Sequence, residues 1–217
     1  MPNDFLDNWN DFCDYSTECE IHITVNDYER ISADSLEGWE DFKYTHIVLS
    51  KGNSPSQKMI TKRVNDSLGS AYKICQNASK ALARMGYSVV RKKIEVPPWS
   101  RLAPITKEDV NFNHGGCYFE SHIKMIIGDN EQAIENFTKI AEYCGAQLSR
   151  NAFKETKNGV CERFITQRSY NCDMAENQRN LSRLLYYLVN WNQDILEIEK
   201  EYVVYDSNLG LDYGWLN

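Results

Sequence analysis

The sequence lacks any apolar run that approaches the ~18 residues of a transmembrane helix, so we expect no membrane span. Its first residues are acidic and contain no apolar stretch, which argues against a secretory signal peptide. With five prolines and eleven glycines among 217 residues, a fibrous or linker-like chain is excluded. The expectation is a cytoplasmic globular protein, long enough to bury a hydrophobic core.

Motifs for common metal and nucleotide sites are also missing. The seven cysteines form an odd set without a CxxC pair or zinc-type spacing, so we expect reduced thiols that act mainly as small core residues. The sequence contains no P-loop, no GxGxxG and no GxSxG motif. We therefore predict neither a metal nor a cofactor.

The chain divides into two similar halves. The first lobe spans residues 11–96, the second spans 117–205, a proline-containing linker covers 97–116, and a tail covers 206–217. Consecutive prolines cannot continue a helix or a central strand, which places the linker between the lobes. The sequence leaves the oligomeric state open.

Each half has the order strand, helix, strand, strand, helix, strand. Alternating apolar and polar residues predict strands at 19–25, 46–50, 58–63, 88–96, 118–126, 146–153, 161–169 and 195–205. Apolar residues at helical spacing predict helices at 35–42, 67–85, 130–144 and 176–191. This is the order of a ferredoxin-like unit, in which right-handed crossovers place both helices on one sheet face. We predict an α+β fold, with two ferredoxin-like lobes whose open faces form a central cleft.

The first strands of the two lobes carry matching polar side chains on one face, because side chains alternate along a strand. The pattern is Glu-x-His followed two residues later by a third polar residue, and its members are Glu20, His22 and Thr24, and Glu120, His122 and Lys124. The two histidines are 100 residues apart.

The third strands match as well, because Thr61 and Arg63 recur as Thr166 and Arg168 at a constant offset of 105 residues. First and third strands are neighbours in a ferredoxin-like sheet, where facing side chains lie ~5 Å apart. We therefore expect each lobe to present an imidazole, a hydroxyl and a guanidinium on its open face.

These groups suit a phosphate. Arginine binds phosphate oxygens, threonine donates a hydrogen bond, and histidine exchanges protons near neutral pH. One histidine would deprotonate the attacking hydroxyl while the other protonates the leaving oxygen. The pattern predicts a metal-independent phosphoesterase for a nucleotide or short RNA phosphodiester, with the phosphate held by Thr61, Arg63, Thr166, Arg168 and Lys124. The net charge of -7 argues against long double-stranded nucleic acid and against an anionic membrane as partners.

The same layout resembles the 2H phosphoesterase superfamily, whose motif is His, hydrophobic, Ser or Thr, hydrophobic. His22-Ile23-Thr24-Val25 fits this motif, and His122-Ile123-Lys124-Met125 departs from it at Lys124. The resemblance implies that His22, His122 and Thr24 are catalytic and that Glu20 and Glu120 orient the imidazoles.

Another interpretation follows from the same residues. Glu20 and Glu120 can form ion pairs with Arg63 and Arg168 across the sheet, which would neutralise the proposed phosphate site. The chain would then be a non-catalytic binding protein that holds a small anionic ligand or a protein partner on its open sheet faces.

Three further segments carry expectations. We expect the basic residues 91–93 to be a solvated strand end and residues 197–201 to form an amphipathic edge strand. In the tail, Leu209, Leu211, Tyr213 and Trp215 are expected to anchor the segment on the body of the protein, with a lid over the cleft as the alternative.

Overall fold

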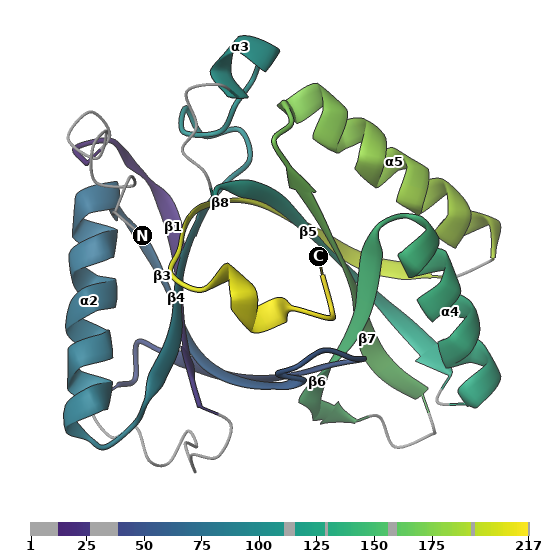
Figure 1. The fold of residues 1–217 in the computed structure, drawn as a ribbon, viewed down its shortest axis with the longest axis horizontal. Helices are drawn as coiled ribbons and strands as arrows, with labels where there is room; N and C mark the ends of the chain where they lie inside the picture. Colours follow the sequence, from purple (N-terminus) through teal and green to yellow (C-terminus); the bar gives the residue numbers. More distant parts are fainter. Residues whose placement is uncertain are drawn as a thin grey trace.

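The computed structural model describes residues 13–26, 39–110, 116–128, 130–155, 160–191 and 194–216, which form one closed antiparallel barrel (Figure 1). The strand order around the barrel is β1-β3-β2-β6-β7-β5-β8-β4. The strands are β1 (Ser16–Val25), β2 (Lys43–Leu49), β3 (Ser56–Ser67), β4 (Val89–Val96), β5 (Tyr118–Gly128), β6 (Ala146–Glu155), β7 (Val160–Tyr170) and β8 (Ile195–Asp206). The helices are α2 (Leu68–Arg84), α3 (Lys107–Val110), α4 (Glu131–Tyr143), α5 (Met174–Asn190) and the 3-10 helix η3 (Leu209–Asp212).

Two four-stranded sheets of the same topology make up this barrel. Strands β1 to β4 are arranged as β4-β1-β3-β2, and β5 to β8 repeat this order as β8-β5-β7-β6. The predicted α+β repeat of ferredoxin-like lobes is thereby confirmed. The sheets also join along both edges, where β2 pairs with β6 and β4 pairs with β8. The predicted cleft is therefore the interior of a closed barrel. Closure is favourable because the backbone N–H and C=O groups at the sheet edges pair with each other, whereas an open cleft would leave them without strand partners.

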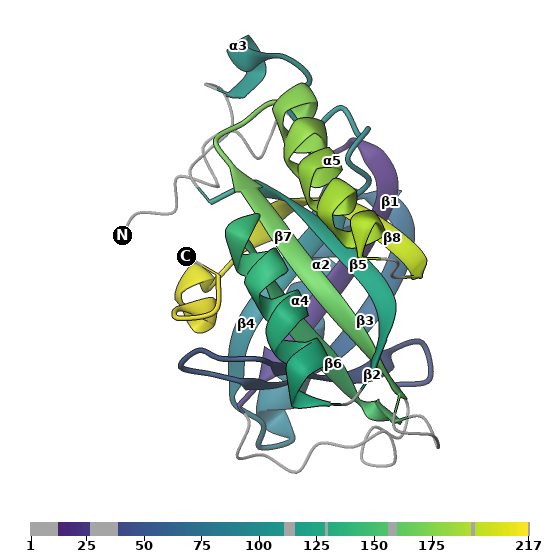
Figure 2. The ribbon, with the colours of Figure 1, turned by 90° about the vertical axis from the view of Figure 1, so that its right-hand side faces the viewer.

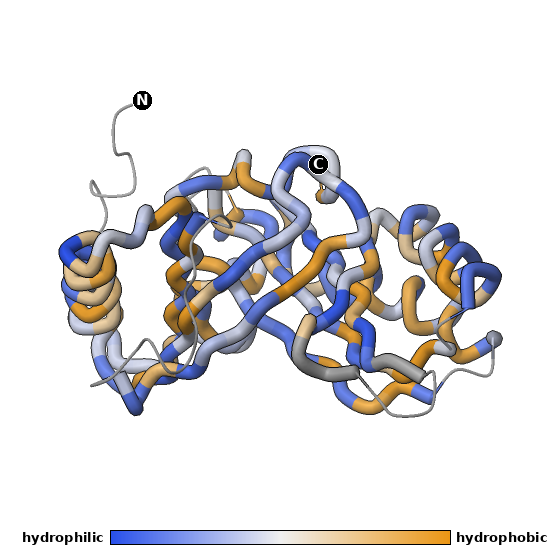
Figure 3. Tube along the Cα trace, turned by 90° about the horizontal axis from the view of Figure 1, so that it is seen from below, coloured by the Kyte–Doolittle hydropathy of each residue, from blue (hydrophilic) through white to orange (hydrophobic). Residues whose placement is uncertain are grey.

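Helices cover the outside of the barrel. Helix α2 lies on one side, and α4 and α5 lie together on the other (Figures 1 and 2). The apolar faces of the strands pack beneath them, so that Ile21 and Ile23 are buried with Leu82 of α2, and Ile123 is buried with Leu184 of α5. Hydrophilic and hydrophobic positions alternate along many strands (Figure 3). The apolar side chains beneath the helices alternate with side chains that face the barrel interior, and these are mostly polar, with Ile47, Met59 and Phe164 among the exceptions.

Capping residues define the helix ends close to their predicted positions. The side chains of Ser67, Asn130 and Asp173 accept hydrogen bonds from the first backbone N–H groups of α2, α4 and α5. Gly86 and Gly145 follow α2 and α4 with positive φ angles, as a residue after a helix commonly requires.

The helix predicted at 35–42 is not borne out where it can be assessed. Residues 27–38 lie outside the described residues, and residues 39–42 form a turn in which Phe42 N donates to Trp39 O at 2.8 Å. Within the described ranges, none of the helices combines the length and apolar character needed to cross a membrane.

Core packing beneath α5 gives a stability prediction. Replacing the fully buried Leu184 with Ala is expected to lower the free energy of unfolding by about 2–5 kcal/mol, because it leaves a cavity against β7 and α4. Val189 on the same helix is 58% exposed, so Val189→Ala should change the free energy of unfolding by less than about 0.5 kcal/mol. Urea denaturation measures both, and equal losses would contradict the packing described here.

Candidate functional site

The inward side chains enclose a cavity of about 540 Å³. His22 and His122, one from each lobe, both line it. The lining contains six basic side chains (Lys43, Arg63, Arg91, Lys93, Lys124 and Arg168) and six acidic ones (Glu20, Asp41, Glu120, Glu197, Glu199 and Asp212). The cavity is large enough for a small organic ligand, and its formal charges nearly balance.

In the first lobe, His22 lies between a carboxylate and a hydroxyl. Its Nε2 is 2.7 Å from Glu95 Oε2, and its Nδ1 is 3.0 Å from Thr61 Oγ1. A carboxylate only accepts, so Nε2 donates to Glu95, and in this tautomer Nδ1 is the atom that can accept the Thr61 hydroxyl. Burial raises the pKa of Glu95, but Lys93 and His22 outweigh it and hold this pKa well below its usual range. Glu95 is thus an ionised carboxylate that orients the imidazole.

The second lobe repeats this arrangement with wider spacing. His122 Nδ1 is 2.9 Å from Thr166 Oγ1, while its Nε2 lies 3.4 Å from Glu120 and 3.6 Å from Glu201. Burial opposes the charged form of His122, but the hydrogen bond and charge of Glu120 outweigh it, so its pKa is raised above 6.5. His122 therefore favours the imidazolium form more than an ordinary histidine does.

Lys93 connects the two imidazole systems. Its Nζ lies 2.5 Å from Glu95 Oε1 and 2.6 Å from Glu120 Oε2, so one ammonium group bridges a carboxylate from each lobe. Burial lowers the pKa of Lys93, but Glu120 and Glu95 outweigh it and keep this pKa well above 10.5. The bridge makes one continuous polar network from His22 to His122.

Both arginines predicted to bind phosphate form ion pairs. Arg63 Nε lies 2.5 Å from Glu20 and its Nη2 lies 2.5 Å from Glu199, while Arg168 Nε lies 2.5 Å from Glu120. These are the cross-strand pairs that the alternative interpretation anticipated. A ligand anion that binds either guanidinium must therefore compete with a carboxylate already in place.

The remaining predicted residues line the same cavity. Lys124 lies 3.4 Å from Glu162 and 3.9 Å from Glu197. Thr24 faces Met59 and Arg91 in the strand register, and the hydroxyls beside the imidazoles belong to Thr61 and Thr166 instead. Glu20 is 3.8 Å from His22 Nε2, farther than Glu95. The structure thus gathers all ten predicted site residues around one cavity, with Glu95 nearer to His22 than the predicted Glu20.

Glu201 is a carboxyl group surrounded by other carboxyl groups. Burial raises its pKa, and the charges of Glu95 and Glu199 raise it further, well above 4.5. A carboxylate oxygen of Glu201 lies within 4.8 Å of ligand atoms of Glu120 and His122, and also of Glu20 and Glu199, so each of the two sets is close enough together to share a metal ion. In both groups a cation of the chain is already present, since Arg63 pairs with Glu20 and Glu199, and Lys93 pairs with Glu120.

Two sequence-based expectations about neighbouring strands are wrong. Arg91 and Lys93 are only 5% and 9% exposed, so residues 91–93 are not a solvated strand end. Strand β8 lies between β5 and β4 and is not an edge strand. These errors hid Arg91, Lys93, Glu95 and Glu201 from the predicted site. The signal was present in β4, where Arg91, Lys93 and Glu95 alternate on one face.

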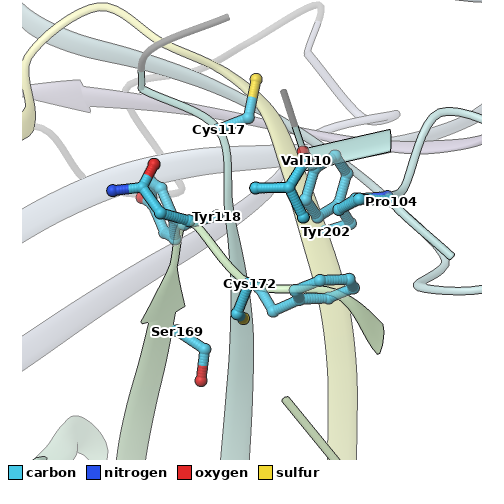
Figure 4. Close-up of a pocket in the computed structure, with 9 residues that line it drawn as sticks. Pro104, Val110, Cys117, Tyr118, Ser169, Cys172 and Tyr202 are labelled. Atoms are coloured by element: carbon cyan, nitrogen blue, oxygen red, sulfur yellow. The ribbon is translucent and has the colours of Figure 1, made fainter. Parts of the chain in front are cut away.

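The described thiols lie outside this network. Cys117 and Cys172 border a separate hollow of about 10 Å³, room for about one water molecule, between Pro104 and Tyr202 (Figure 4). Burial raises the pKa of each thiol to about 11. They are therefore protonated at neutral pH and behave as small core residues, not as nucleophiles.

The sequence matches no protein-family model and none of the curated proteins. Solved structures with similarity to this chain include the small subunit of acetolactate synthase from Thermotoga maritima, at 12% identity and a TM-score of 0.28, covering 87% of this chain and 95% of that one. Chlorite dismutase from Candidatus Nitrospira defluvii is similar at 12% identity and a TM-score of 0.26, covering 90% and 94%.

The raised pKa of Glu201 gives a stability prediction. Above pH 4.5 the unfolded chain ionises this residue while the folded chain keeps its proton, so stability falls as the pH rises through that window. Glu201→Gln cannot ionise, and we expect its free energy of unfolding near neutral pH to exceed that of the wild type by about 1 kcal/mol or more. The difference should shrink as the pH falls below the ordinary glutamate pKa.

Denaturant unfolding across this pH range measures the effect. Glu197→Gln is the matched control, because Glu197 lies on the same strand with its side chain 63% exposed and should change little at either pH. A Glu201→Gln variant that is less stable than the wild type near neutral pH would contradict the assignment.

Proposed function

We propose that the barrel binds a small phosphorylated molecule and hydrolyses a phosphodiester of a nucleotide or short RNA, without a metal in the chemical step. The observation that carries this proposal is that two imidazole–hydroxyl pairs face one cavity. The imidazole Nδ1 and the hydroxyl oxygen are 3.0 Å apart in the pair of His22 and Thr61, and 2.9 Å apart in the pair of His122 and Thr166. This is the chemistry that the 2H resemblance implies, here with the threonine hydroxyls next to the substrate.

His22 acts as the general base in this proposal. An attacking water gives a proton to Thr61 Oγ1 while Thr61 gives its own proton to Nδ1 of His22. The water oxygen then forms the new bond to phosphorus, and the imidazolium produced is stabilised by Glu95, 2.7 Å from Nε2. General-base assistance of this kind contributes about 10²–10⁴-fold to a rate.

His122 acts as the general acid, as its raised pKa favours. The bond from phosphorus to the leaving oxygen breaks, and that oxygen takes a proton from Thr166, which recovers one from Nδ1 of His122. One water is consumed, the products are a phosphomonoester and an alcohol, and the next proton exchange with solvent restores both rings.

Charge selects a phosphodiester over a polyphosphate. The lining holds six basic and six acidic side chains, so a phosphodiester with one negative charge disturbs this balance less than a polyphosphate with several. Lys93 lines the cavity and contacts the carboxylates beside both imidazoles, so a phosphate bound there would share its ammonium group with Glu95 and Glu120.

Turnover of 2′,3′-cyclic and 3′,5′-cyclic nucleotides and of dinucleotides, with ATP as a polyphosphate comparison, tests the proposal. His22→Gln and His122→Gln each remove the basic Nδ1 and should lower kcat/KM for a phosphodiester by about 10²–10⁴-fold. His46→Gln is the matched control, because His46 on β2 forms a hydrogen bond with Ser56 on β3 and does not line the cavity. Wild-type rates in both cavity variants would refute two-histidine catalysis.

A second candidate function is binding without turnover. It is favoured by the ion pairs of Arg63 and Arg168 and by the carboxylates at both imidazole Nε2 atoms, which form a resting network that needs no reaction to explain it. Calorimetric binding of a nucleotide that the wild-type protein never converts would favour this candidate.

A further inference from the structure

The C-terminal segment, residues 207–216, lies across one opening of the barrel (Figures 1 and 2). Trp215 and Leu216 are buried against Leu49, and Trp215 Nε1 donates to Leu148 O at 3.1 Å. Asn53 N donates to Tyr213 O at 3.0 Å. Trp215 thus anchors the tail, as predicted, while Tyr213 is mostly exposed. Because the tail is fixed at Trp215 and at the end of β8, the residues between these two points lie in the opening.

Asp212 is the charged residue that this segment places inside the barrel. It is 1% exposed, and its Oδ2 accepts from Arg91 Nη1 and Arg168 Nη2, both at 2.8 Å. Its Oδ1 accepts from Gln57 Nε2 at 2.7 Å. Burial raises the pKa of Asp212, but the two arginines outweigh it, so the group is an anion. Two guanidinium groups from different lobes therefore converge on a single anionic oxygen.

Both arginines are held in place by other groups. Arg91 Nε contacts the two carboxylate oxygens of Asp206 at 3.0 and 3.1 Å, and its Nη2 donates to Tyr118 Oη at 3.0 Å. Arg168 pairs with Glu120 and stacks on the ring of Tyr118, 4.8 Å from its centroid. The donors aimed at Asp212 would therefore keep their positions if its carboxylate moved away.

We infer that Arg91, Arg168 and Gln57 form an anion subsite for a phosphate group, and that Asp212 occupies this subsite as an internal stand-in. Guanidinium pairs bind phosphate oxygens with strong, directional hydrogen bonds. The subsite is distinct from the imidazole–hydroxyl pairs and requires only binding, so its test does not depend on hydrolysis.

Titration of inorganic phosphate by calorimetry at constant ionic strength tests the subsite. Asp212→Asn removes the competing anion and should tighten phosphate binding by about tenfold or more, which is the effect of losing a bound competitor. Asp41→Asn is the matched control, because it removes the same charge from the lining at a side chain that is 82% exposed, and it should change the affinity by less than about twofold.

A second substitution locates the bound phosphate. Adding Arg91→Gln to Asp212→Asn should abolish the gain in affinity. If the gain persists in the double variant, or if Asp41→Asn produces the same gain, phosphate binds elsewhere in the barrel and the subsite is refuted.

Hydrogen exchange on the wild-type protein covers the case in which Asp212→Asn does not fold. Phosphate that displaces Asp212 should speed exchange of the amides of Trp215 and Leu216, which donate to Asp212 O at 2.9 and 3.1 Å. The same concentration of chloride is the control. Unchanged or slower exchange of these amides with phosphate would overturn the inference.

Discussion

One buried ammonium group, that of Lys93, holds the polar interior together. Ions taken out of water require close partners of opposite charge, and removing one partner of such a pair is strongly destabilising. Lys93 is the cation shared by Glu95 of the first lobe and Glu120 of the second. The positions of both imidazoles depend on these carboxylates, so the geometry of the candidate site rests on this bridge. A flexible lysine stem with a compact charge suits such a bridge better than the planar fork of arginine.

Barrel closure explains why so many charges meet in one place. Helix α2 covers one face of the first sheet and α4 and α5 cover the same face of the second, and most of the buried apolar side chains of the strands lie beneath them. Joining the sheets along β2–β6 and β4–β8 turns the other faces inward. The alternation that makes each segment a strand therefore also lines the cavity with polar groups. Eight strands leave an interior wide enough to hold side chains and a small ligand.

Local patterns were sufficient to predict the strands, three of the helices and the central pairs of the site. The recurrence of Thr61 and Arg63 at a constant offset, combined with ferredoxin-like topology, placed each hydroxyl beside its histidine, and the strand register agrees. Edge pairing between β4 and β8 is a long-range contact that no local pattern encodes. Without it, Lys93 looks like part of a solvated basic run. Asp212 was missed because it lies in a tail without strand or helix periodicity.

The two lobes differ in the residues that surround their imidazoles. By their pairing with the histidine strands, Glu95 on β4 and Glu201 on β8 are equivalent positions, and so are Lys93 and Glu199. A cation in one lobe thus corresponds to an anion in the other. Lys93 lowers the pKa of Glu95, whereas Glu95 and Glu199 help to raise that of Glu201. A symmetric barrel would give both imidazoles the same surroundings and would not bias their pKa values apart. The divergence of β4 from β8 therefore gives the two imidazoles different electrostatic surroundings, which in the proposed reaction would favour different roles for them.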